Sequence, residues 1–423
     1  MLCARSVRAI RVYDGAVNRA WWLLLASAAC ASGTERAKPP GSGFTPQPAP
    51  GTPQPPGSGS AATAPEPTPD THSPSPTPPA RAPSIEMTFA GDVHFGRYKP
   101  WGYRAIPAET HDPFAEVEAL LDSDHALVNL ETTVLTEYPE HSPYGSLMRF
   151  VTSPDRVATL VAHKVDTVTL ANNHYWDMKQ AGAEITPKLV AELGLNVIGA
   201  SRADEPYIRV ETIDVKGWRV GFIAVATECN TDWDAAPLKL PWAERGKIGA
   251  AVAPVVEAAR ADHDLVIVSP HWGKEYLDVP EDWQIRAARK WIDAGADAVI
   301  GHHPHVLQGM EIYKNHLIAY SLGNFLFDNT SSNRKWGGVL RVTFGREDGG
   351  APCVKDVGFS PTITVKTESK DPKRIRLVRV THAEGKTFKT ITNRVIELSK
   401  AKGLQKTKWT VDGQRLTTTP TCK

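Results

Sequence analysis

Short apolar runs that alternate with helical patterns are the feature that most limits how this chain can fold. The runs are rich in β-branched residues and are bounded by polar or glycine-containing segments, which is typical of buried strands. Expected strands cover residues 85–91, 125–131, 165–172, 195–200, 218–227, 263–270, 296–302 and 316–324. Expected helices cover 153–163, 186–194 and 280–295, with proline-containing starts and, for the last two, glycine at the end. This order predicts an α/β domain whose sheets are covered by helices.

The composition is that of a globular protein. Of the 423 residues, 41% are hydrophobic and 22% are charged, which is enough to bury a sizeable core. The formal net charge is only +1, so the chain lacks the strong positive charge typical of proteins that bind nucleic acid, and no nucleic-acid partner is expected. The charge is uneven, because the segment from Lys366 to Lys423 holds fifteen Lys and Arg against five Asp and Glu. This segment either binds an anionic surface or polymer, or is a solvated basic face.

Residues 1–30 have the pattern of an export signal. Four arginines precede the apolar run "AWWLLLASAA" at 20–29, which is too short to span a bilayer comfortably. The small residues before Cys30 are similar to a bacterial lipoprotein signal, in which Cys30 becomes the lipidated first residue of the mature protein. Ser27 departs from that pattern, so ordinary cleavage and an uncleaved apolar anchor stay open as alternatives.

Residues 31–84 are dominated by Pro, Gly, Ser, Thr and Ala, a composition that predicts an extended, disordered spacer. Signal and spacer together predict an extracytoplasmic domain anchored at the cell-envelope membrane. In such an oxidising compartment Cys353 and Cys422 can bridge the C-terminal segment, although the sequence leaves the pairing open. We expect a main domain over 85–345 and a basic, β-rich segment over 346–423, where alternating runs extend a sheet or form a small appendage.

Polar side chains capable of binding metal follow the expected strands. The α/β folds place their chemistry at the carboxyl ends of strands, where side chains from distant segments meet. The candidate donors are Asp92, His94, Glu131, Asn173, His271, His303 and His305. Carboxylate, amide and imidazole donors without thiolate suit Mn, Fe, Zn or Mg. Seven donors exceed the needs of one tetrahedral ion, and they fit two divalent ions about 3.5–4 Å apart with a bridging carboxylate.

The motifs "GDVHFGR", "NLETT", "LANNHYWD", "HWGKEY", "GHHPHVLQ" and "YSLGNFLFD" occur in the order seen in one protein family. Over roughly residues 85–328 the chain resembles the CapA family of poly-γ-glutamate capsule synthesis proteins, a branch of the calcineurin-like metallophosphoesterases. The resemblance implies a four-layer α/β/β/α sandwich with a binuclear metal centre. It implies that Asp92, His94 and His305 hold one ion, that Asn173, His271 and His303 hold the other, that Glu131 bridges them, and that His174 is the catalytic acid or charge-stabilising histidine.

Other residues fit substrate-binding or orienting roles beside the metals. Arg149, Asn324 and Asp328 match family motif positions, and Asp177 and Glu275 can orient histidine ligands. For Asp177 a helix-start carboxylate is an equal alternative. One departure from the wider superfamily is the bridging position, where Glu131 in "NLE" stands in place of the Asp of a GDxxD motif. The longer side chain puts enzyme activity in question even where metal is bound.

Two functions of different classes follow from the resemblance. The first is an envelope-tethered hydrolase in capsule, poly-γ-glutamate or other envelope polymer metabolism, in which metal hydroxide attacks a phosphate ester or amide. The second is a noncatalytic metal-binding module that assists synthesis, anchoring or export of an anionic capsule polymer together with other capsule proteins. Metal-dependent turnover of an aryl phosphate favours the first. Polyanion binding that survives metal removal favours the second.

If Cys30 is the site of lipid attachment, Cys30→Ser will move the protein from the membrane fraction to the soluble exported fraction, because the acyl anchor is lost. Fractionation of cells expressing the wild type and the variant measures this directly. Membrane association that does not change in the variant would leave an uncleaved apolar anchor as the better interpretation.

Overall fold

The computed structural model describes residues 81–106, 111–144, 149–200, 207–230, 241–347, 350–368 and 375–422. The chain divides into two units, Met1–Ser73 and Pro74–Lys423, and the fold below is that of the second. The expected export signal, Cys30 and nearly all of the expected spacer lie outside the described residues. Within the described ranges, no helix has the length and apolar character needed to cross a membrane.

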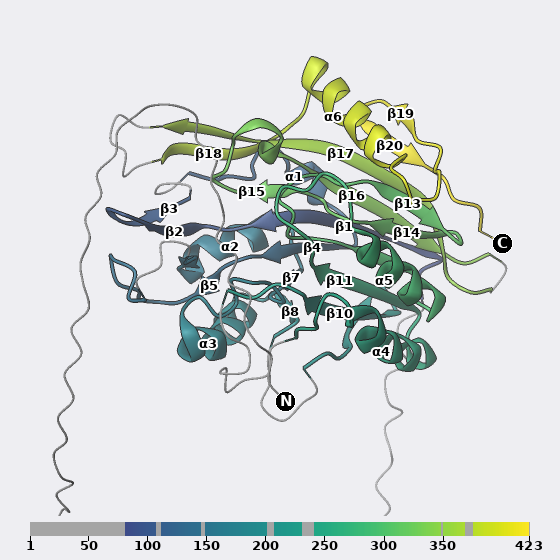
Figure 1. Cartoon of the computed structure of the whole chain (residues 1–423), viewed down its shortest axis with the longest axis horizontal. Helices are drawn as coiled ribbons and strands as arrows, with labels where there is room; N and C mark the ends of the chain where they lie inside the picture. The colour runs from purple at the N-terminus through teal and green to yellow at the C-terminus, as the bar shows by residue number, and fades with distance from the viewer. Residues whose placement is uncertain are drawn as a thin grey trace, which may run out of the picture. The chain divides into compact units, whose positions relative to one another are not determined.

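Within those ranges, ten strands form one sheet, in the order β19-β20-β17-β16-β1-β4-β7-β8, with β15 beside β1 and β18 beside β17 (Figure 1). Strand β1 is central because it pairs in parallel with β4 and antiparallel with β16. The bounds are β1 Ser84–Val93, β4 His125–Leu130, β7 Thr167–Thr169, β8 Asn196–Ile198, β15 Asn324–Leu326, β16 Trp336–Gly345, β17 Cys353–Glu368, β18 Ile375–His382, β19 Thr410–Asp412 and β20 Arg415–Thr418.

A second sheet of six strands has the order β13-β14-β12-β11-β10-β9 within the described residues. Its centre is parallel, since β10, β11, β12 and β14 run the same way, while β9 and β13 pair antiparallel at the edges. The bounds are β9 Glu211–Val215, β10 Trp218–Ala226, β11 Leu265–His271, β12 Ala298–Ile300, β13 Met310–Tyr313 and β14 His316–Ala319. Two small pairs stand apart, β2 Gly96–Lys99 with β3 Gly102–Ala105, and β5 Thr133–Val134 with β6 Val151–Thr152.

Side-chain alternation along the strands separates the apolar core between the two sheets from the cores on their outer faces. On β11, Leu265 and Ile267 enter a core shared with residues of the ten-stranded sheet, whereas Val266 and Val268 face the opposite way. Because successive strand residues point to opposite faces, a strand buried on both sides carries a continuous apolar run, as β11 does from Leu265 to Val268. The inter-sheet core therefore lies between two sheets, each covered on its outer face.

Helices cover the two outer faces. Residues of α1 Glu118–Leu121, α2 Pro154–Ala162 and α3 Lys179–Glu192 share a core with the ten-stranded sheet, while α4 Ile248–Asp262 and α5 Asp282–Asp293 share one with the six-stranded sheet. Helices α4 and α5 lie side by side (Figure 1). The four-layer α/β/β/α sandwich predicted from the sequence is confirmed.

Helix α3 begins earlier than expected. The sequence analysis placed a start at Thr186, but the helix runs from Lys179 and contains Pro187 in its interior. Proline lacks the N–H that would reach the carbonyl four residues earlier, that of Ala183. The hydroxyl of buried Tyr175 donates to that carbonyl at 2.8 Å instead. A tertiary contact thus replaces the missing helical bond.

The C-terminal segment extends the ten-stranded sheet through β17, β18, β20 and β19, in agreement with the expected strands. It also contains a helix that the sequence analysis did not name, α6 Gly385–Leu398, which lies beside β19 and β20 in Figure 1. Phe388, Ile391 and Val395 of α6 enter the inter-sheet core. Their spacing of three and four residues is the helical signal that was available in the sequence.

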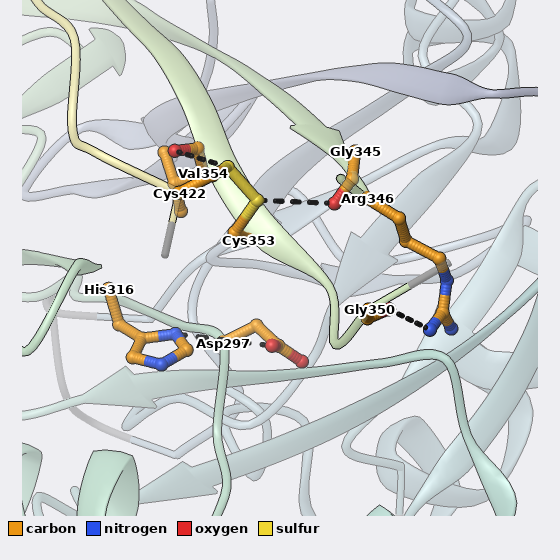
Figure 2. The surroundings of a disulfide bond; sticks show 8 residues. All are labelled: Asp297, His316, Gly345, Arg346, Gly350, Cys353, Val354 and Cys422. Atoms are coloured by element: carbon orange, nitrogen blue, oxygen red, sulfur yellow. Dashed lines mark hydrogen bonds and ion pairs between the residues drawn. A yellow bond between two sulfur atoms is a disulfide. The ribbon is translucent and has the colours of Figure 1, made fainter. Parts of the chain in front are cut away.

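A disulfide between Cys353 and Cys422 ties the start of β17 to the C-terminal end of the chain (Figure 2). The two cysteines are 69 positions apart, and the closed loop contains β17, β18, α6, β19 and β20. The pairing left open by the sequence is therefore present in the structure. The bond removes conformational freedom from the unfolded chain over the whole extension.

Replacing Cys353 and Cys422 together by Ser will lower the free energy of unfolding by up to about 4 kcal/mol, the chain-entropy value for a loop of this length. Denaturant unfolding of the oxidised wild type and the double variant measures the loss. Wild type kept in reductant serves as the control and should unfold at the midpoint of the variant. Equal midpoints for oxidised and reduced wild type would contradict the prediction.

Candidate metal centre

Glu131 lies at the middle of a cluster of polar side chains. It follows β4 directly, and its backbone N–H donates to the carbonyl of Val93 at 2.8 Å, which fixes the end of β4 against β1. Its side chain is fully buried, and neither carboxylate oxygen has a hydrogen-bond partner among the described residues. Oε1 lies 3.8 Å from Nε2 of His174, 3.8 Å from Nε2 of His271 and 3.7 Å from Nε2 of His305.

On one side of Glu131, its carboxylate forms a group with Asp92 and His305 in which one donor atom from each residue lies within 4.8 Å of the others. Asp92 Oδ2 lies 3.1 Å from His305 Nδ1, and Oδ1 accepts a hydrogen bond from the Asn129 amide at 2.8 Å. Asp92 sits at an irregularity in the β1 register, which turns the strand where its carboxylate leaves the sheet.

On the other side, Glu131 forms a second group of the same dimensions with His271 and His303. His271 Nε2 lies 2.9 Å from His303 Nδ1 and 2.9 Å from the Asn173 side-chain oxygen. Three potential ligand atoms therefore converge, from the ends of β7, β11 and β12. Glu131 is common to both groups, as the bridging role expected from the sequence requires.

The loop after β12 carries two of these histidines in an unusual backbone conformation. His303 has φ 98° and His305 has φ 56°, values that cost free energy for residues other than glycine and that cluster at functional sites. Gly301 allows the loop to approach the end of β14, because a Cβ there would lie 2.1 Å from the Tyr320 carbonyl oxygen. The tight packing fixes the direction in which both imidazoles leave the chain.

His94 lies in neither group, although the sequence analysis expected it to hold the same ion as Asp92 and His305. Its buried ring stacks on Phe150, with centroids 4.4 Å apart, and packs edge-on against Phe327 at 4.2 Å. Both ring nitrogens are buried without a hydrogen bond in the described part of the chain, and Nε2 lies 3.5 Å from Asp328 Oδ1. The aromatic contacts hold the ring beside the cluster.

His174, the expected catalytic histidine, points toward the shared carboxylate. Its Nδ1 lies 2.6 Å from Asp177 Oδ2, and Nε2 lies 3.8 Å from Glu131 Oε1. The ring stacks almost parallel on Phe150, with centroids 3.7 Å apart. Buried Asp177 also accepts bonds from the Phe150 backbone N–H at 2.5 Å and from Arg149 Nη1 at 3.3 Å. Asp177 thus makes the contacts that an orienting role needs, and it does not cap α3, whose N-cap is Met178.

The remaining expected residues lie at different depths. Asn324 is buried, and its side-chain oxygen lies 3.0 Å from His305 Nδ1, so it helps to fix the direction of that ring. Asp328 is also buried and is held beside His94 by Arg97, whose Nη2 lies 2.7 Å from Oδ1. Glu275 lies on the exposed loop after β11, where its charge acts on Glu131 and His305 through space.

Three contributors were missed by the sequence analysis. The Asn129 amide lies between Asp92 and His271, 2.8 Å from Asp92 Oδ1 and 3.2 Å from His271 Nδ1. Asn230 Oδ1 accepts from the Asn173 amide at 3.3 Å, and its Nδ2 lies 3.3 Å from His174 Nδ1. Phe150 stacks between His94 and His174. An asparagine within the apolar run of β4, and another shortly after β10, were available signals for the first two.

Burial sets the protonation of most of these imidazoles. It lowers the pKa of His94 to about 4 and that of His303 to about 3, and it moves the pKa of His271 well below its usual value. At neutral pH these rings are unprotonated, which is the form that binds metal ions. His302 lies in neither ligand group and is also neutral, since burial lowers its pKa to about 4.

Two groups of the cluster have a raised pKa instead, the carboxyl of Glu131 and the imidazole of His305. Burial raises the pKa of Glu131 well above its usual value, and the nearby charge of Asp92 adds to that effect. Burial alone would lower the pKa of His305, but the Glu131 and Asp92 carboxylates reverse this and raise it to about 9. Burial also raises the pKa of Asp92, but the hydrogen bond and charge of His305 reverse this and hold it below its usual value, so Asp92 is the carboxylate whose charged form the cluster favours.

The residues that form this site lie in a part of the chain that is similar to known proteins. The profile described as "Bacterial capsule synthesis protein PGA_cap" matches residues 86–329. The chain is 32% identical over 252 residues to the capsule biosynthesis protein CapA of Bacillus anthracis, which is 58% of this chain and 60% of that protein. It is 30% identical over 248 residues to the PGA biosynthesis protein CapA of Bacillus subtilis, 58% of this chain and 63% of that protein. The matches thus span less than two thirds of each relative.

Among solved structures, a 5'-nucleotidase from Candida albicans superposes with a TM-score of 0.35 and 13% identity, over 60% of this chain and 47% of that one. The matched profile covers more than half of the sequence and contains all seven expected metal ligands together with His174. The family resemblance predicted from the order of the motifs is confirmed. The chain belongs to the bacterial capsule synthesis protein family, PGA_cap.

Proposed function

We propose that this protein is a metal-dependent hydrolase of the CapA type that acts on a phosphate ester or amide in capsule or other envelope polymer metabolism. The observation that carries the proposal is the Glu131 carboxylate, which is fully buried with both oxygens lacking a hydrogen-bond partner among the described residues. A buried carboxylate is costly unless it is paired or coordinates a metal. Its membership of two ligand groups supports a position between two divalent ions.

The donor set fits such ions. The two groups offer carboxylate oxygens and imidazole nitrogens without thiolate, and His94 adds two buried nitrogens that lack partners in the described structure. This chemistry suits Mn, Fe, Zn or Mg. When bound, a pair of divalent ions polarises the scissile group and lowers the pKa of a bound water. The proposed ligands are Asp92, His94, Glu131, Asn173, His271, His303 and His305.

The chain's own residues supply the proton chemistry. The Asp177 carboxylate accepts the Nδ1 proton of His174 and so directs Nε2 toward Glu131 and the space beside it. An imidazole held in this way can carry a proton on Nε2 to the leaving group. Stacking on Phe150 keeps the ring plane fixed, so His174 needs little reorganisation during the reaction.

The biological setting is part of the proposal. The names of the Bacillus relatives refer to capsule and PGA biosynthesis, which supports an anionic envelope polymer as substrate or partner. Attachment to the envelope membrane through Cys30 and cooperation with capsule synthesis or export proteins rest on the sequence pattern. The alternative of a noncatalytic module that binds the polymer is supported by the excess of basic residues between Lys366 and Lys423.

Asp92→Asn and His303→Ala will each lower the bound metal and abolish metal-dependent hydrolysis, because each removes a donor from one of the two groups. Metal analysis of the purified variants, with p-nitrophenyl phosphate as a general substrate, measures both effects. His125→Ala is the matched control, since His125 is a buried histidine that contacts Thr167 and belongs to neither group. Full metal content in both ligand variants would refute the assignment.

His174→Ala will keep both metals and the fold but lower turnover by about 10²–10⁴-fold, the usual contribution of a general acid or base. The loss will be smaller for p-nitrophenyl phosphate than for an alkyl phosphate, because nitrophenolate leaves without a proton. Metal analysis and steady-state kinetics on the two substrates separate these effects.

Loss of metal from His174→Ala would instead identify His174 as a ligand. Wild-type turnover in that variant would make the histidine structural. Absence of turnover in the metal-loaded parent protein would favour the noncatalytic polymer-binding module.

A further inference from the structure

We propose that Arg394, on the C-terminal helix α6, is a positioning residue of the candidate metal centre. Through Asp278 it holds the segment 273–280, which follows β11. That segment fixes the backbone between the expected ligands His303 and His305, and the expected consequence is slower release of bound metal. This inference rests on the metal binding in the proposed function, but its test measures metal release and not turnover.

The backbone between His303 and His305 sets how the two ligand groups lie relative to each other, because His303 belongs to one group and His305 to the other. Both residues have positive φ, a conformation that persists only where the surrounding structure fixes it. One such contact is the hydrogen bond from the Tyr276 N–H to the Pro304 carbonyl, at 2.8 Å. Movement of the segment 273–280 therefore acts on both ligand groups at once.

The segment 273–280 makes a second contact with the loop after β12. The buried side chain of Gln308 donates from Nε2 to the Leu277 carbonyl at 2.7 Å. Tyr276 has φ 64°, which is costly for a residue other than glycine, so the segment itself needs to be held in place. Residues 274–276 are exposed, so packing in an apolar core does not hold this part of it.

Two side chains hold the segment at Asp278. The Asp278 Oδ2 accepts from Arg394 Nη2 at 2.5 Å, and Oδ1 accepts from the Asn333 amide at 2.9 Å. Helix α6 is fixed by its apolar residues in the inter-sheet core, so Arg394 extends from a rigid element. The Arg394 and Asp278 side chains are 40% and 38% exposed, so either can be replaced without leaving a buried charge unpaired.

The residues that hold this segment lie outside the part of the chain that matches the family. The matched profile ends at residue 329, before η2 Ser332–Lys335, which carries Asn333, and before α6. The end of α6 also contacts the end of the loop after β12, since the Met310 N–H donates to Ser399 Oγ at 3.0 Å. The C-terminal extension therefore supports the ligand-bearing backbone as well as extending the sheet.

Zinc release from the purified full chain tests the role of Arg394. The protein is loaded with Zn²⁺, and transfer of the ion to an excess of a chromogenic chelator is followed by absorbance. Arg394→Met and Asp278→Ala will each speed the transfer about two- to fivefold, the factor that corresponds to the free energy of an exposed ion pair. Arg394→Lys will restore most of the slow release, since it keeps the charge. Lys400→Met is the matched control, because Lys400 forms an exposed pair with Glu397 at the end of the same helix.

The double variant Arg394→Met/Asp278→Ala will release Zn²⁺ no faster than Asp278→Ala alone, because the two side chains act through one contact. Additive effects of the two substitutions would contradict this. Denaturant unfolding of the same proteins without metal separates a purely structural role. If Arg394→Met lowers the unfolding midpoint but releases Zn²⁺ at the wild-type rate, the ion pair only stabilises the fold and the positioning role is wrong.

The outcomes for metal release and for hydrolysis are distinguishable. Release that depends on Arg394 in a protein without hydrolytic activity would uphold the positioning role and refute the proposed hydrolase. Metal-dependent hydrolysis by a parent protein whose Zn²⁺ release is unchanged in Arg394→Met would uphold the hydrolase and refute the positioning role. A parent protein that binds neither Zn²⁺ nor Mn²⁺ would refute both.

Discussion

The burial of one carboxylate, Glu131, is the constraint on which the rest of the site depends. Desolvation of an ionised carboxylate costs several kcal/mol even after the protein relaxes, and Glu131 has no hydrogen bond within the described structure to offset that cost. Three imidazole nitrogens lie within 3.8 Å of one of its oxygens. Of these rings, His271 is neutral because burial lowers its pKa, whereas His305 is cationic because the nearby carboxylates raise its pKa. Positive charge between these donors would stabilise the whole cluster, as a candidate metal centre requires.

The four-layer fold is what brings these donors together. Asp92 and Glu131 come from the ten-stranded sheet, whereas His271 and His303 follow strands of the six-stranded sheet. Neither sheet alone holds both ligand groups. The apolar core between the sheets, with Phe89 from one and Ile267 from the other, fixes their separation and so the distance between donors. Changes in that core therefore alter the spacing of the candidate ligand groups without contacting them.

The strand-end rule predicted much of the site, and its failures have physical causes. It brought Asp92 and Glu131 together at the ends of the parallel strands β1 and β4, and His271 and His303 together after the parallel strands β11 and β12, and the packing of the two sheets brings these pairs into contact. It overlooked Asn230 because the segment after β10 carries no histidine or carboxylate that the site uses. The stack of Phe150 between two histidines depends on tertiary approach of β6 to the site, for which a local pattern holds no signal. Helix α3 started early because the Tyr175 hydroxyl replaces a bond that Pro187 cannot make.

The Phe150 ring lies between two polar groups of the candidate site. One ring face stacks on His174 and the other on His94, and Arg97 lies near the same ring. His174 is fixed by Asp177, and His94 lies next to Asp328, so an acid–base pair and an ion-paired cluster stand on opposite sides of one aromatic side chain. Because the phenyl ring cannot donate or accept a proton, it separates the two polar networks. The hydrogen bonds that fix His174 and the contacts that hold Asp328 therefore do not connect through this ring, but His174 still acts on His94 through space and helps to lower its pKa.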